Sequence, residues 1–476
     1  MADPRPLVLD VDGTFLKTDM LFESFWAGLG RDPIATLGAL RHLGDRPRLK
    51  GELARIGQPN VALMPVNADI LALADAARDE GRQVVLASAS DAALVRKLAD
   101  AHGVVDNSMG SHGGVNLKSA VKADALAERY GRAAFDYAGN EPVDRPVWDK
   151  AHGVVIVGDL PTHAKALRAE GHPVTELPGG WSWSQARRAL RTHQYVKNVL
   201  LFLPVIAAHA FNWQAFGLVL LGIVAFSAAA SSIYIINDLL DLEADRLHAT
   251  KRNRPFASGA VPIQVGMALF VACLGVALGL GAMLGSGFLA TVGVYILLSL
   301  AYSLRLKRMR WIDVFCLATL YTLRVVAGAT ASGVEATTTM LVFVFPVFVT
   351  LGCVKRLTEL AKATDDAKLP GRGYARADYT DLMNMAGVGV VGALVIFALY
   401  TVSDQAAQLY QTRWIMWLAL LPIALWLFRM VALGARGQMD YDPIVFALRD
   451  RQGLGLLAIT LSLMFWSAGL WAEWLG

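Results

Sequence analysis

Charged residues are scarce in this chain of 476 residues: Asp, Glu, Lys and Arg make up 18% of it, against 55% for the hydrophobic residues. The scarcity is uneven, because acids and bases crowd the first 190 residues and apolar runs dominate the remainder. This split excludes a chain that is soluble throughout. It predicts a soluble domain over residues 1–180, a connector over 181–196 and a polytopic membrane domain over 197–476.

Cysteine is rarer still. The three cysteines, Cys273, Cys316 and Cys353, all lie in apolar runs and are too dispersed for a zinc site or a disulfide framework. Both are therefore excluded, and core thiols are expected. The first 14 residues also lack a basic stretch followed by an apolar one. We therefore expect no signal peptide and a cytoplasmic N-terminus.

Two aspartates follow the first predicted strand. Residues 6–11 read as a buried strand that ends in Asp10-Val11-Asp12-Gly13-Thr14. One carboxylate can attack phosphorus while the second, two residues on, protonates the leaving oxygen, and Gly13 permits the tight turn between them. An ordinary strand-end turn would also use such residues. The motif resembles the nucleophile motif of the haloacid dehalogenase-like phosphohydrolases.

Further segments follow in the order of that family. A second predicted strand, 83–87, leads to Ser88, and residues 116–122 open an amphipathic helix that carries Lys118 and Lys122. The resemblance implies that Ser88 hydrogen-bonds the phosphate. It also implies that Lys122, with Lys118 as the competitor, offsets the charge of nucleophile and phosphate.

A third predicted strand, 135–138, precedes the place of the family's metal-binding acids. That place holds Asn140 where the usual pattern has an acid, and Asp144 four residues later. An amide oxygen can still bind Mg²⁺, but one negative charge is missing, which puts metal affinity and turnover in question. The metal ligands that the resemblance implies are Asp10, Asp12, Asn140 and Asp144.

The segment between the first two motifs, residues 15–80, is too long for a turn and carries helical apolar spacing, which predicts a cap. Residues 154–157 predict a further strand. The expected fold is therefore an α/β, Rossmannoid haloacid dehalogenase-like domain, with a helical cap and catalytic groups at the carboxyl ends of parallel strands. Pro178–Gly180 marks its end, and 181–193 reads as a basic amphipathic connector at the membrane surface.

Apolar runs near the roughly 20 residues that a spanning helix needs recur in the second part of the chain. Nine are predicted to span the membrane: 197–212, 215–236, 261–284, 287–304, 311–332, 338–356, 383–402, 413–434 and 453–473. Bases gather in every second loop, whereas the other loops carry only Arg413. This asymmetry places the N-terminal domain and the candidate chemistry in the cytoplasm, and the C-terminus outside. The expected location is the inner (plasma) membrane of a bacterial cell.

The loop between the second and third runs carries acids and bases segregated by sign. Asp238, Asp241 and Asp245 recur at three and four residues, so on a continued helix they share one face and can hold one divalent cation. The bases that follow are Lys251, Arg252 and Arg254. A carboxylate cluster beside a cationic cluster suits a Mg²⁺-diphosphate. A solvated polar loop would require the charges, but not their spacing or segregation.

This motif, Asn237-Asp238-x-x-Asp241-x-x-x-Asp245, resembles the first aspartate-rich motif of the UbiA superfamily of intramembrane prenyltransferases, in which nine helices and this position are usual. Their second aspartate-rich motif follows the sixth helix. Here that place reads Lys355-Arg356-Leu357-Thr358-Glu359-Leu360, with cations dominant. The pattern is similar to the decaprenyl-phosphate phosphoribosyltransferase branch, in which a polyprenyl monophosphate is the nucleophile and 5-phosphoribosyl diphosphate the donor. The added phosphates give a physical reason for cations.

The resemblance implies one Mg²⁺ in each domain, held in the membrane domain by Asp238, Asp241 and Asp245. An arginine within a membrane helix, Arg324, costs on the order of 2.5 to 3.5 kcal/mol and should face a cavity and a phosphate. The residues expected to bind substrate in the membrane domain are Asn237, Lys251, Arg252, Arg254, Tyr302, Lys307, Arg324, Lys355, Arg356, Glu359, Tyr374 and Arg449.

The favoured hypothesis is a bifunctional membrane enzyme. It transfers 5-phosphoribose to a polyprenyl phosphate with release of pyrophosphate, and its phosphatase then removes the 5-phosphate to give a polyprenyl-phosphate ribose for cell-envelope glycans. A second hypothesis is a prenyltransferase that joins a prenyl diphosphate to an aromatic or other acceptor, with the phosphatase as an independent activity. A third is a transporter or phosphate sensor. The expected partners are the bilayer, the lipid and the donor, with no nucleic acid. Lipid length, final glycan and oligomeric state stay open.

Overall fold

The computed structural model describes residues 5–103, 105–363, 369, 372–439 and 442–475, which form two compact units. The first comprises Met1–Leu190 and Tyr234–Val271, and the second comprises Arg191–Ile233 and Ala272–Gly476. The segment with the aspartate motif therefore groups with the N-terminal region. Each unit is described separately.

The first unit contains a six-stranded parallel sheet in the order β3-β2-β1-β4-β5-β6. Its strands are β1 (Leu7–Leu9), β2 (Val84–Asp91), β3 (Asn107–Ser111), β4 (Asp136–Gly139), β5 (Val154–Val157) and β6 (Val174–Leu177). The four strands predicted from sequence are confirmed. Strands β3 and β6 were not predicted, because NSMGS and VTEL lack an apolar run.

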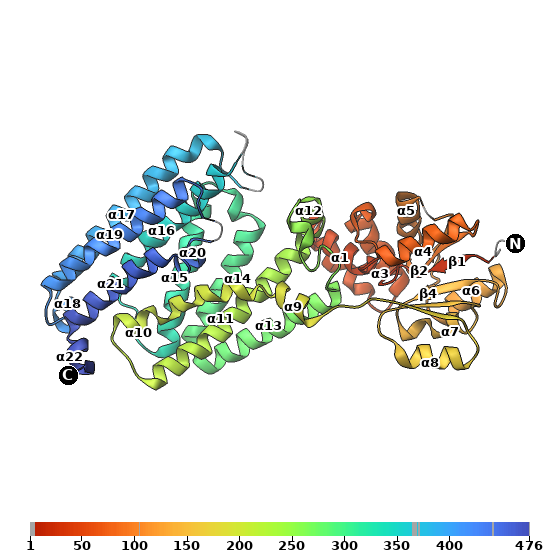
Figure 1. The fold of residues 1–476 in the computed structure, drawn as a ribbon, viewed down its shortest axis with the longest axis horizontal. Helices are drawn as coiled ribbons and strands as arrows, with labels where there is room; N and C mark the ends of the chain where they lie inside the picture. Colours follow the sequence, from red (N-terminus) through yellow and green to blue (C-terminus); the bar gives the residue numbers. More distant parts are fainter. Residues whose placement is uncertain (1–4, 104, 364–368, 370–371, 440–441, 476) are drawn as a thin grey trace. The chain divides into compact units, whose positions relative to one another are not determined.

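Helices cover both faces of this sheet, as Figure 1 shows. Alternate residues of β1 enter different cores: Leu7 and Leu9 pack with α4 (Ala68–Asp79) and α5 (Ala92–His102), and Val8 packs on the opposite face. The opposite face is covered by α6 (Ala120–Tyr130), α7 (Arg145–Trp148) and α8 (Pro161–Ala169). Strand order reverses between β1 and β4, and ligands bind beyond the carboxyl ends of strands at such a point.

The helical insertion predicted between the first two motifs is present. It consists of α1 (Met20–Arg31), α2 (Pro33–Ala39), η1 (Leu40–His42), α3 (Arg46–Gly57) and η2 (Val61–Leu63). Helices α1 and α3 approach so closely that a Cβ on Gly57 would lie 2.2 Å from the Ser24 carbonyl oxygen. A side chain at position 57 would therefore separate the two cap helices.

The rest of the first unit is α9 (Trp183–Ala189) and the segment 234–271. That segment contains the end of α11 (Trp213–Leu240), α12 (Leu242–Leu247), η5 (Lys251–Asn253) and the start of α13 (Ile263–Leu284). It is called the motif segment below.

The second unit is helical. Besides parts of α11 and α13, its main helices are α14 (Ser286–Leu304), α15 (Ile312–Ser332), α16 (Thr338–Ala361), α17 (Tyr379–Thr401), α19 (Trp414–Ala435) and α21 (Arg451–Ala468). Shorter ones are η4 (Thr192–Phe202), α10 (Leu203–Ala207), η6 (Leu306–Arg308), η7 (Arg376–Asp378), α18 (Asp404–Leu409), α20 (Pro443–Ala447) and α22 (Leu470–Leu475). Helices α16, α17, α19 and α21 lie side by side (Figure 1).

Seven helices within the described residues are long and apolar enough to cross a membrane, so the predicted nine spans are not confirmed. The first expected span is divided between η4 and α10, because Pro204 in the first turn of α10 has no N–H to continue a helix. The last expected span corresponds to α21, which has 18 residues and begins with the polar pair Arg451 and Gln452.

Candidate functional site

The end of β1 carries a buried ion pair. Lys122 of α6 donates to Asp10 Oδ1 at 2.5 Å and to the Tyr137 hydroxyl at 2.9 Å, and that hydroxyl donates to Asp144 Oδ1 at 3.0 Å. All four residues are buried. Position 122 therefore faces the nucleophile candidate, whereas Lys118 lies on the surface before the helix. The sheet has thus brought the first motif together with two others that lie more than a hundred residues further along the chain.

The second aspartate of the motif contacts the end of β2. Asp12 Oδ2 accepts hydrogen bonds from the Ser88 hydroxyl at 3.0 Å and the Ser90 hydroxyl at 2.8 Å. Its other oxygen accepts from the Met20 N–H at 2.8 Å, at the start of cap helix α1. Ser88 was predicted from sequence and Ser90 was not, although both belong to the same Ser-Ala-Ser run.

Asn140 lies against the turn of the motif. Its Oδ1 accepts from the Thr14 hydroxyl at 3.0 Å, and a Cβ on Gly13 would lie 2.3 Å from its Nδ2. Gly13 also has a φ of +80°, so its small size and its conformation are both required. Asp144 is oriented by the backbone N–H groups of Asn140 and Glu141, both at 3.2 Å from Oδ2.

Burial governs the charge at this site. It raises the pKa of Asp10 to about 7, an effect that Lys122 opposes. Burial also disfavours the charge on Lys122, but Asp10 and Asp144 outweigh it and raise the Lys122 pKa. A further cation beside Asp10 would favour its ionised, nucleophilic form.

The cap supplies one cation that sequence reasoning missed. Lys50 of α3 donates to the Ala89 carbonyl oxygen and, at 3.3 Å, to Asn116 Oδ1. Burial lowers its pKa, while Asp12 and Asp19 act in the opposite direction. Lys50 lies far along the chain from every motif, so no local sequence pattern indicated that it would be near them.

The aspartate motif converges on one cationic nitrogen. Arg254 Nη1 lies 3.0 Å from Asp238 Oδ1 and 2.7 Å from Asp245 Oδ2, and both carboxylates are buried. Helical hydrogen bonds continue through the break at Asp241, from its N–H to the Asn237 carbonyl and from the Asp245 N–H to the Asp241 carbonyl. That continuity places Asp238 and Asp245, two turns apart, on one face.

The remaining residues of this motif are less enclosed. Asn237 and Asp241 are half-buried, whereas Lys251 and Arg252, on η5, are exposed. Among the described residues, no group of three or more His, Cys, Asp or Glu side chains is arranged to hold a metal ion. Mg²⁺ is nevertheless commonly bound through one or two carboxylates together with substrate phosphates. The convergence of Asp238 and Asp245 fits that pattern.

A buried ion network occupies the place of the missing second aspartate motif. Arg356 of α16 donates to Asp313 at 2.5 and 3.0 Å, to Glu359 Oε2 at 2.5 Å and to the Tyr302 hydroxyl at 3.0 Å. Arg372 also donates to that hydroxyl, at 3.0 Å. Asp313 was not predicted, although an acid in the first turn of a membrane helix is a signal for a buried partner.

The Asp313 network should contribute to the stability of the folded protein. Asp313→Ala leaves the fully buried Arg356 without its bidentate partner, and removing one member of a buried pair costs about 3–5 kcal/mol. We expect a clearly lower unfolding temperature in detergent. Asp381→Ala, which breaks an exposed pair with Arg310, is the matched control and should cost less than about 1 kcal/mol. Equal melting temperatures for the two variants would contradict a structural role for Asp313.

A second cluster surrounds Asp442, at the start of α20. Asp442 Oδ2 accepts from the Tyr321 hydroxyl at 2.6 Å and lies 2.9 Å from Lys197 Nζ and 3.4 Å from Lys355 Nζ. Burial disfavours the charge on Asp442, but the two lysines outweigh it and hold its pKa below the usual range. Lys197 was missed from sequence. The neighbouring Tyr441 lies outside the described residues.

Two predicted phosphate ligands have partners within the chain. Arg324 is buried and donates to Asn198 Oδ1 at 3.1 Å, to the Leu320 carbonyl at 2.6 Å and to the Tyr295 hydroxyl at 3.3 Å. Arg324 thus lies in the interior, as expected for an arginine in a membrane helix, and its hydrogen-bond partners are groups of the chain itself. Tyr374 is fully buried, and its hydroxyl accepts from the Trp311 N–H at 3.0 Å.

The two remaining candidates, Lys307 and Arg449, lie in surface connections. Lys307 is half-buried on η6, and Arg449 is exposed between α20 and α21. Their roles in binding substrate stay predictions.

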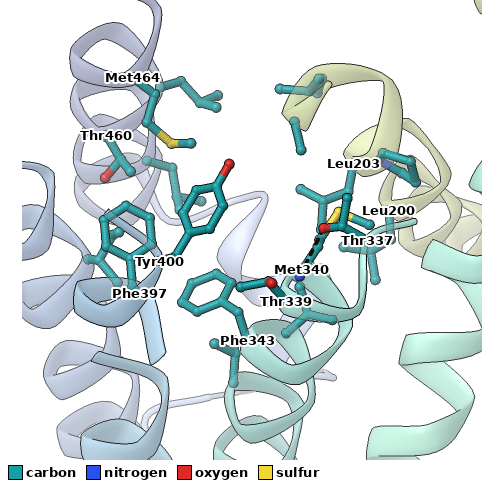
Figure 2. A pocket seen from close by; sticks show the side chains of 18 of the residues that line it. Leu200, Leu203, Thr337, Thr339, Met340, Phe343, Phe397, Tyr400, Thr460 and Met464 are labelled. Atoms are coloured by element: carbon teal, nitrogen blue, oxygen red, sulfur yellow. Dashed lines mark hydrogen bonds between the residues drawn. The ribbon is translucent and has the colours of Figure 1, made fainter. Parts of the chain in front are cut away.

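An apolar cavity of about 450 Å³ lies within the second unit. Figure 2 shows Leu200 and Leu203 on one side of it, with Phe343, Phe397 and Tyr400 among the facing side chains. Ile444, Ala447 and Leu448 of the α20 region also line it. Asp442, which contacts two lysines, therefore precedes the lining residue Ile444 by only two positions in the chain.

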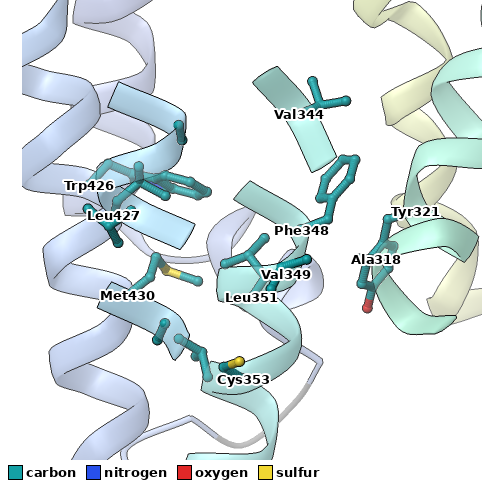
Figure 3. Packing of buried hydrophobic residues seen from close by; sticks show 14 of the residues in the cluster. Ala318, Tyr321, Val344, Phe348, Val349, Leu351, Cys353, Trp426, Leu427 and Met430 are labelled. Atoms are coloured by element: carbon teal, nitrogen blue, oxygen red, sulfur yellow. The ribbon is translucent and has the colours of Figure 1, made fainter. Parts of the chain in front are cut away.

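The cavity adjoins a closely packed core. Val344, Phe348, Leu351, Trp426 and Leu427 line the cavity and also belong to the buried cluster of α15, α16, α17 and α19. Figure 3 shows Phe348 beside Tyr321, a partner of Asp442, and their ring centroids are 5.5 Å apart. Packing thus connects the cavity wall with the lysine cluster.

Comparisons with known proteins identify the family of the membrane region. A model of the UbiA prenyltransferase family matches residues 199–449, more than half of the chain. An uncharacterized protein of Sinorhizobium fredii, y4nM, is 34% identical over 94% of this chain and 88% of its own length.

Two other similarities concern the membrane region. Decaprenyl-phosphate phosphoribosyltransferase of Mycobacterium tuberculosis is 30% identical over 280 residues, which cover 57% of this chain and 90% of that protein. A UbiA homolog from Archaeoglobus fulgidus, solved with GPP and Mg²⁺, is 15% identical with a TM-score of 0.46 and covers 60% of this chain and 99% of that one. With several helices long and apolar enough to cross a bilayer, this chain is an integral membrane protein that belongs to the UbiA prenyltransferase family.

Proposed function

We propose that this protein transfers 5-phosphoribose from 5-phosphoribosyl diphosphate to a polyprenyl phosphate, and that its N-terminal domain then removes the 5-phosphate. The observation that carries the lipid assignment is the apolar cavity, whose lining residues Val199 and Ile444 come two residues after Lys197 and Asp442 in the chain. Asp442 also contacts Lys355. A polyprenyl phosphate has the same two parts, an apolar chain and an anionic end. The donor is suggested by the phosphoribosyltransferase relatives.

In this proposal the lysines bind the lipid phosphate and the cavity holds the nearest part of its chain. Asp442 keeps both ammonium groups close to one another, and the charge of a bound phosphate would offset the repulsion between them. The Asp313 network holds Arg356 in a fixed, buried position.

Asp238 and Asp245, with Asp241, would hold Mg²⁺, which neutralises the pyrophosphate leaving group when bound. A lipid phosphate oxygen forms the new bond to C1 of ribose as the bond from C1 to pyrophosphate breaks. No general base is required, because the attacking phosphate is already ionised. Arg254, which contacts both carboxylates, would exchange them for phosphate oxygens when the donor binds.

In the N-terminal domain, Asp10 would attack the 5-phosphate while Asp12 gives a proton to the leaving ribose oxygen. The phosphoryl group passes to the Asp10 carboxylate and then to water. Lys122 offsets the negative charge beside Asp10, and Ser88 orients Asp12. Asp10 and Asp144, both within 4.0 Å of Lys122 Nζ, would hold Mg²⁺ together with Asp12 and Asn140.

The test uses purified protein with 5-phosphoribosyl diphosphate and polyprenyl phosphate. Release of pyrophosphate together with a ribose-labelled lipid supports the proposal. The second candidate, transfer of a prenyl group from a prenyl diphosphate to an aromatic or other acceptor, is favoured by the family match itself. It is supported instead if the phosphoribosyl pair gives no product and a prenyl diphosphate is consumed.

Filling the cavity should weaken the lipid without affecting the donor. Thr460 lines the cavity on α21, and Thr460→Trp places an indole in the space assigned to the polyprenyl chain (Figure 2). We expect a rise of about tenfold in KM for polyprenyl phosphate, equivalent to about 1.4 kcal/mol, and an unchanged KM for the donor. Val391→Trp, on the exposed face of α17, is the control. An unchanged lipid KM in a correctly folded Thr460→Trp protein would remove the chain from this cavity.

A further inference from the structure

The motif segment packs on the first cap helix of the N-terminal domain. Trp26 of α1 belongs to one buried cluster with Ile235, Leu239 and Leu242 of the motif segment and with Phe256 beyond η5. These apolar side chains are 6% exposed or less. The acids of the motif and the cap are therefore parts of one packed body, although more than 200 residues separate them in sequence.

A buried ion pair lies at this contact. Arg246, the residue after Asp245, donates to Glu23 Oε2 at 3.1 Å and Oε1 at 2.5 Å, and its Nε donates to the Ala257 carbonyl at 3.0 Å. The side chains of Arg246 and Glu23 are 6% and 2% exposed. A bidentate pair fixes orientation as well as distance. The guanidinium group of Arg246 is thereby fixed by a carboxylate of the cap and by a carbonyl of the motif segment, next to Asp245 in the chain.

Glu23 is also joined to the phosphatase motif. Its Oε1 accepts from the Thr18 hydroxyl at 2.7 Å, and the Thr18 carbonyl accepts from the Gly13 N–H at 3.2 Å. Gly13 directly follows Asp12. A short, buried chain of hydrogen bonds therefore runs from the strand-end turn of one candidate site to the residue beside Asp245 of the other.

Three contacts flank the ion pair. Gln264 Nε2 donates to Asp19 Oδ2 at 3.1 Å, and the Asn60 N–H donates to Glu243 Oε1 at 2.7 Å. Gly259 has a φ of +71°, and a Cβ there would lie 2.6 Å from the Cβ of Lys17. The two surfaces are thus matched along their length, which distinguishes this contact from a single surface ion pair.

We propose that Glu23 and Arg246 are positioning residues that couple the two catalytic sites, so that the phosphatase cap sets the geometry of the transferase aspartate motif. The inference rests on the proposed function for the identity of the reactions. Its physical basis is that neither partner can move alone without leaving a buried charge unpaired. By linkage, whatever stabilises the arrangement of the motif segment also stabilises the position of cap helix α1 against it.

The experiment compares Glu23→Gln, Arg246→Gln and the double variant in the full-length protein. Two activities are measured: the Mg²⁺ dependence of pyrophosphate release, and the hydrolysis of p-nitrophenyl phosphate as a small phosphomonoester. We expect each single variant to raise the Mg²⁺ concentration for half-maximal transfer by about tenfold and to slow hydrolysis several-fold. The double variant should be no worse than either single one, because the coupling is already lost.

Arg168→Ala, which breaks an exposed ion pair with Glu176 in the same domain, is the control and should change neither activity. Arg246→Lys, which keeps the charge with fewer hydrogen bonds, should fall between Arg246→Gln and the natural protein. Because a lower overall stability alone would not shift the Mg²⁺ midpoint of the folded fraction, this readout separates positioning from folding.

Unchanged Mg²⁺ midpoints in both single variants, or additive effects in the double variant, would overturn the coupling. Failure of the proposed function is distinguishable, because the natural protein would then release no pyrophosphate from the phosphoribosyl pair. The hydrolysis measurement would still report whether Arg246, which lies outside the phosphatase domain in sequence, controls the phosphatase.

Discussion

Replacing Asp10 by asparagine will leave the lipid product heavier by one phosphate. An amide cannot act as the nucleophile toward phosphorus, and the ion pair with Lys122 at 2.5 Å is lost as well. We expect hydrolysis of phosphomonoesters to fall by about a thousandfold or more. The measurement is a mass spectrum of the lipid formed from polyprenyl phosphate and 5-phosphoribosyl diphosphate, before and after the substitution.

The control for this change is Asp159→Asn, the same substitution at an exposed position just beyond β5. It should leave both hydrolysis and lipid mass as in the natural protein. An Asp10→Asn protein that hydrolyses phosphomonoesters at the natural rate would remove the proposed mechanism from this domain. A heavier lipid in the variant would also establish the order of the two reactions, transfer first and hydrolysis second.

The second large effect is expected at the aspartate motif. Asp238→Ala removes one of the two carboxylates that converge on a single cationic position, and Asp241→Ala removes the acid between them. We expect Mg²⁺-dependent pyrophosphate release to fall by about a hundredfold to a thousandfold in each, because the leaving group loses its charge stabilisation. Release is measured over a range of Mg²⁺ concentrations with saturating lipid.

Asp404→Ala, an exposed acid at the start of α18, is the matched control and should retain full transfer. Full Mg²⁺-dependent transfer by Asp238→Ala and Asp241→Ala would end the metal-diphosphate account of this site.

Short-range patterns were informative for the candidate sites. The spacing of Asp10, Asp12 and Gly13 predicted a strand-end motif, and the structure places it at the end of β1, beside the reversal of strand order. The choice of Lys122 over Lys118 matches the side chain that contacts Asp10. Such features depend on residue type and local period, which a sequence displays directly. Strand β3 was missed for the same reason, because its residues show no period.

Contacts between distant segments had no comparable signal. Arg246 lies in a loop with several other bases, and no local pattern connects it with its partner Glu23, 223 residues away. Asp313 was likewise not predicted, although it fixes the position of the predicted cation Arg356. The sequence alone does not show whether a charged side chain is exposed to solvent or forms a buried ion pair.

By itself, the sequence determined that an α/β sheet domain precedes apolar helices, and that acids and bases are grouped in motifs of defined spacing. These follow from hydrophobic periodicity and from chemical identity, both of which are local. Only the tertiary structure decided that the motif segment packs on the cap, which cations have buried partners, and where an apolar cavity remains. Those outcomes depend on which surfaces bury one another, and burial sets the cost of every unpaired charge.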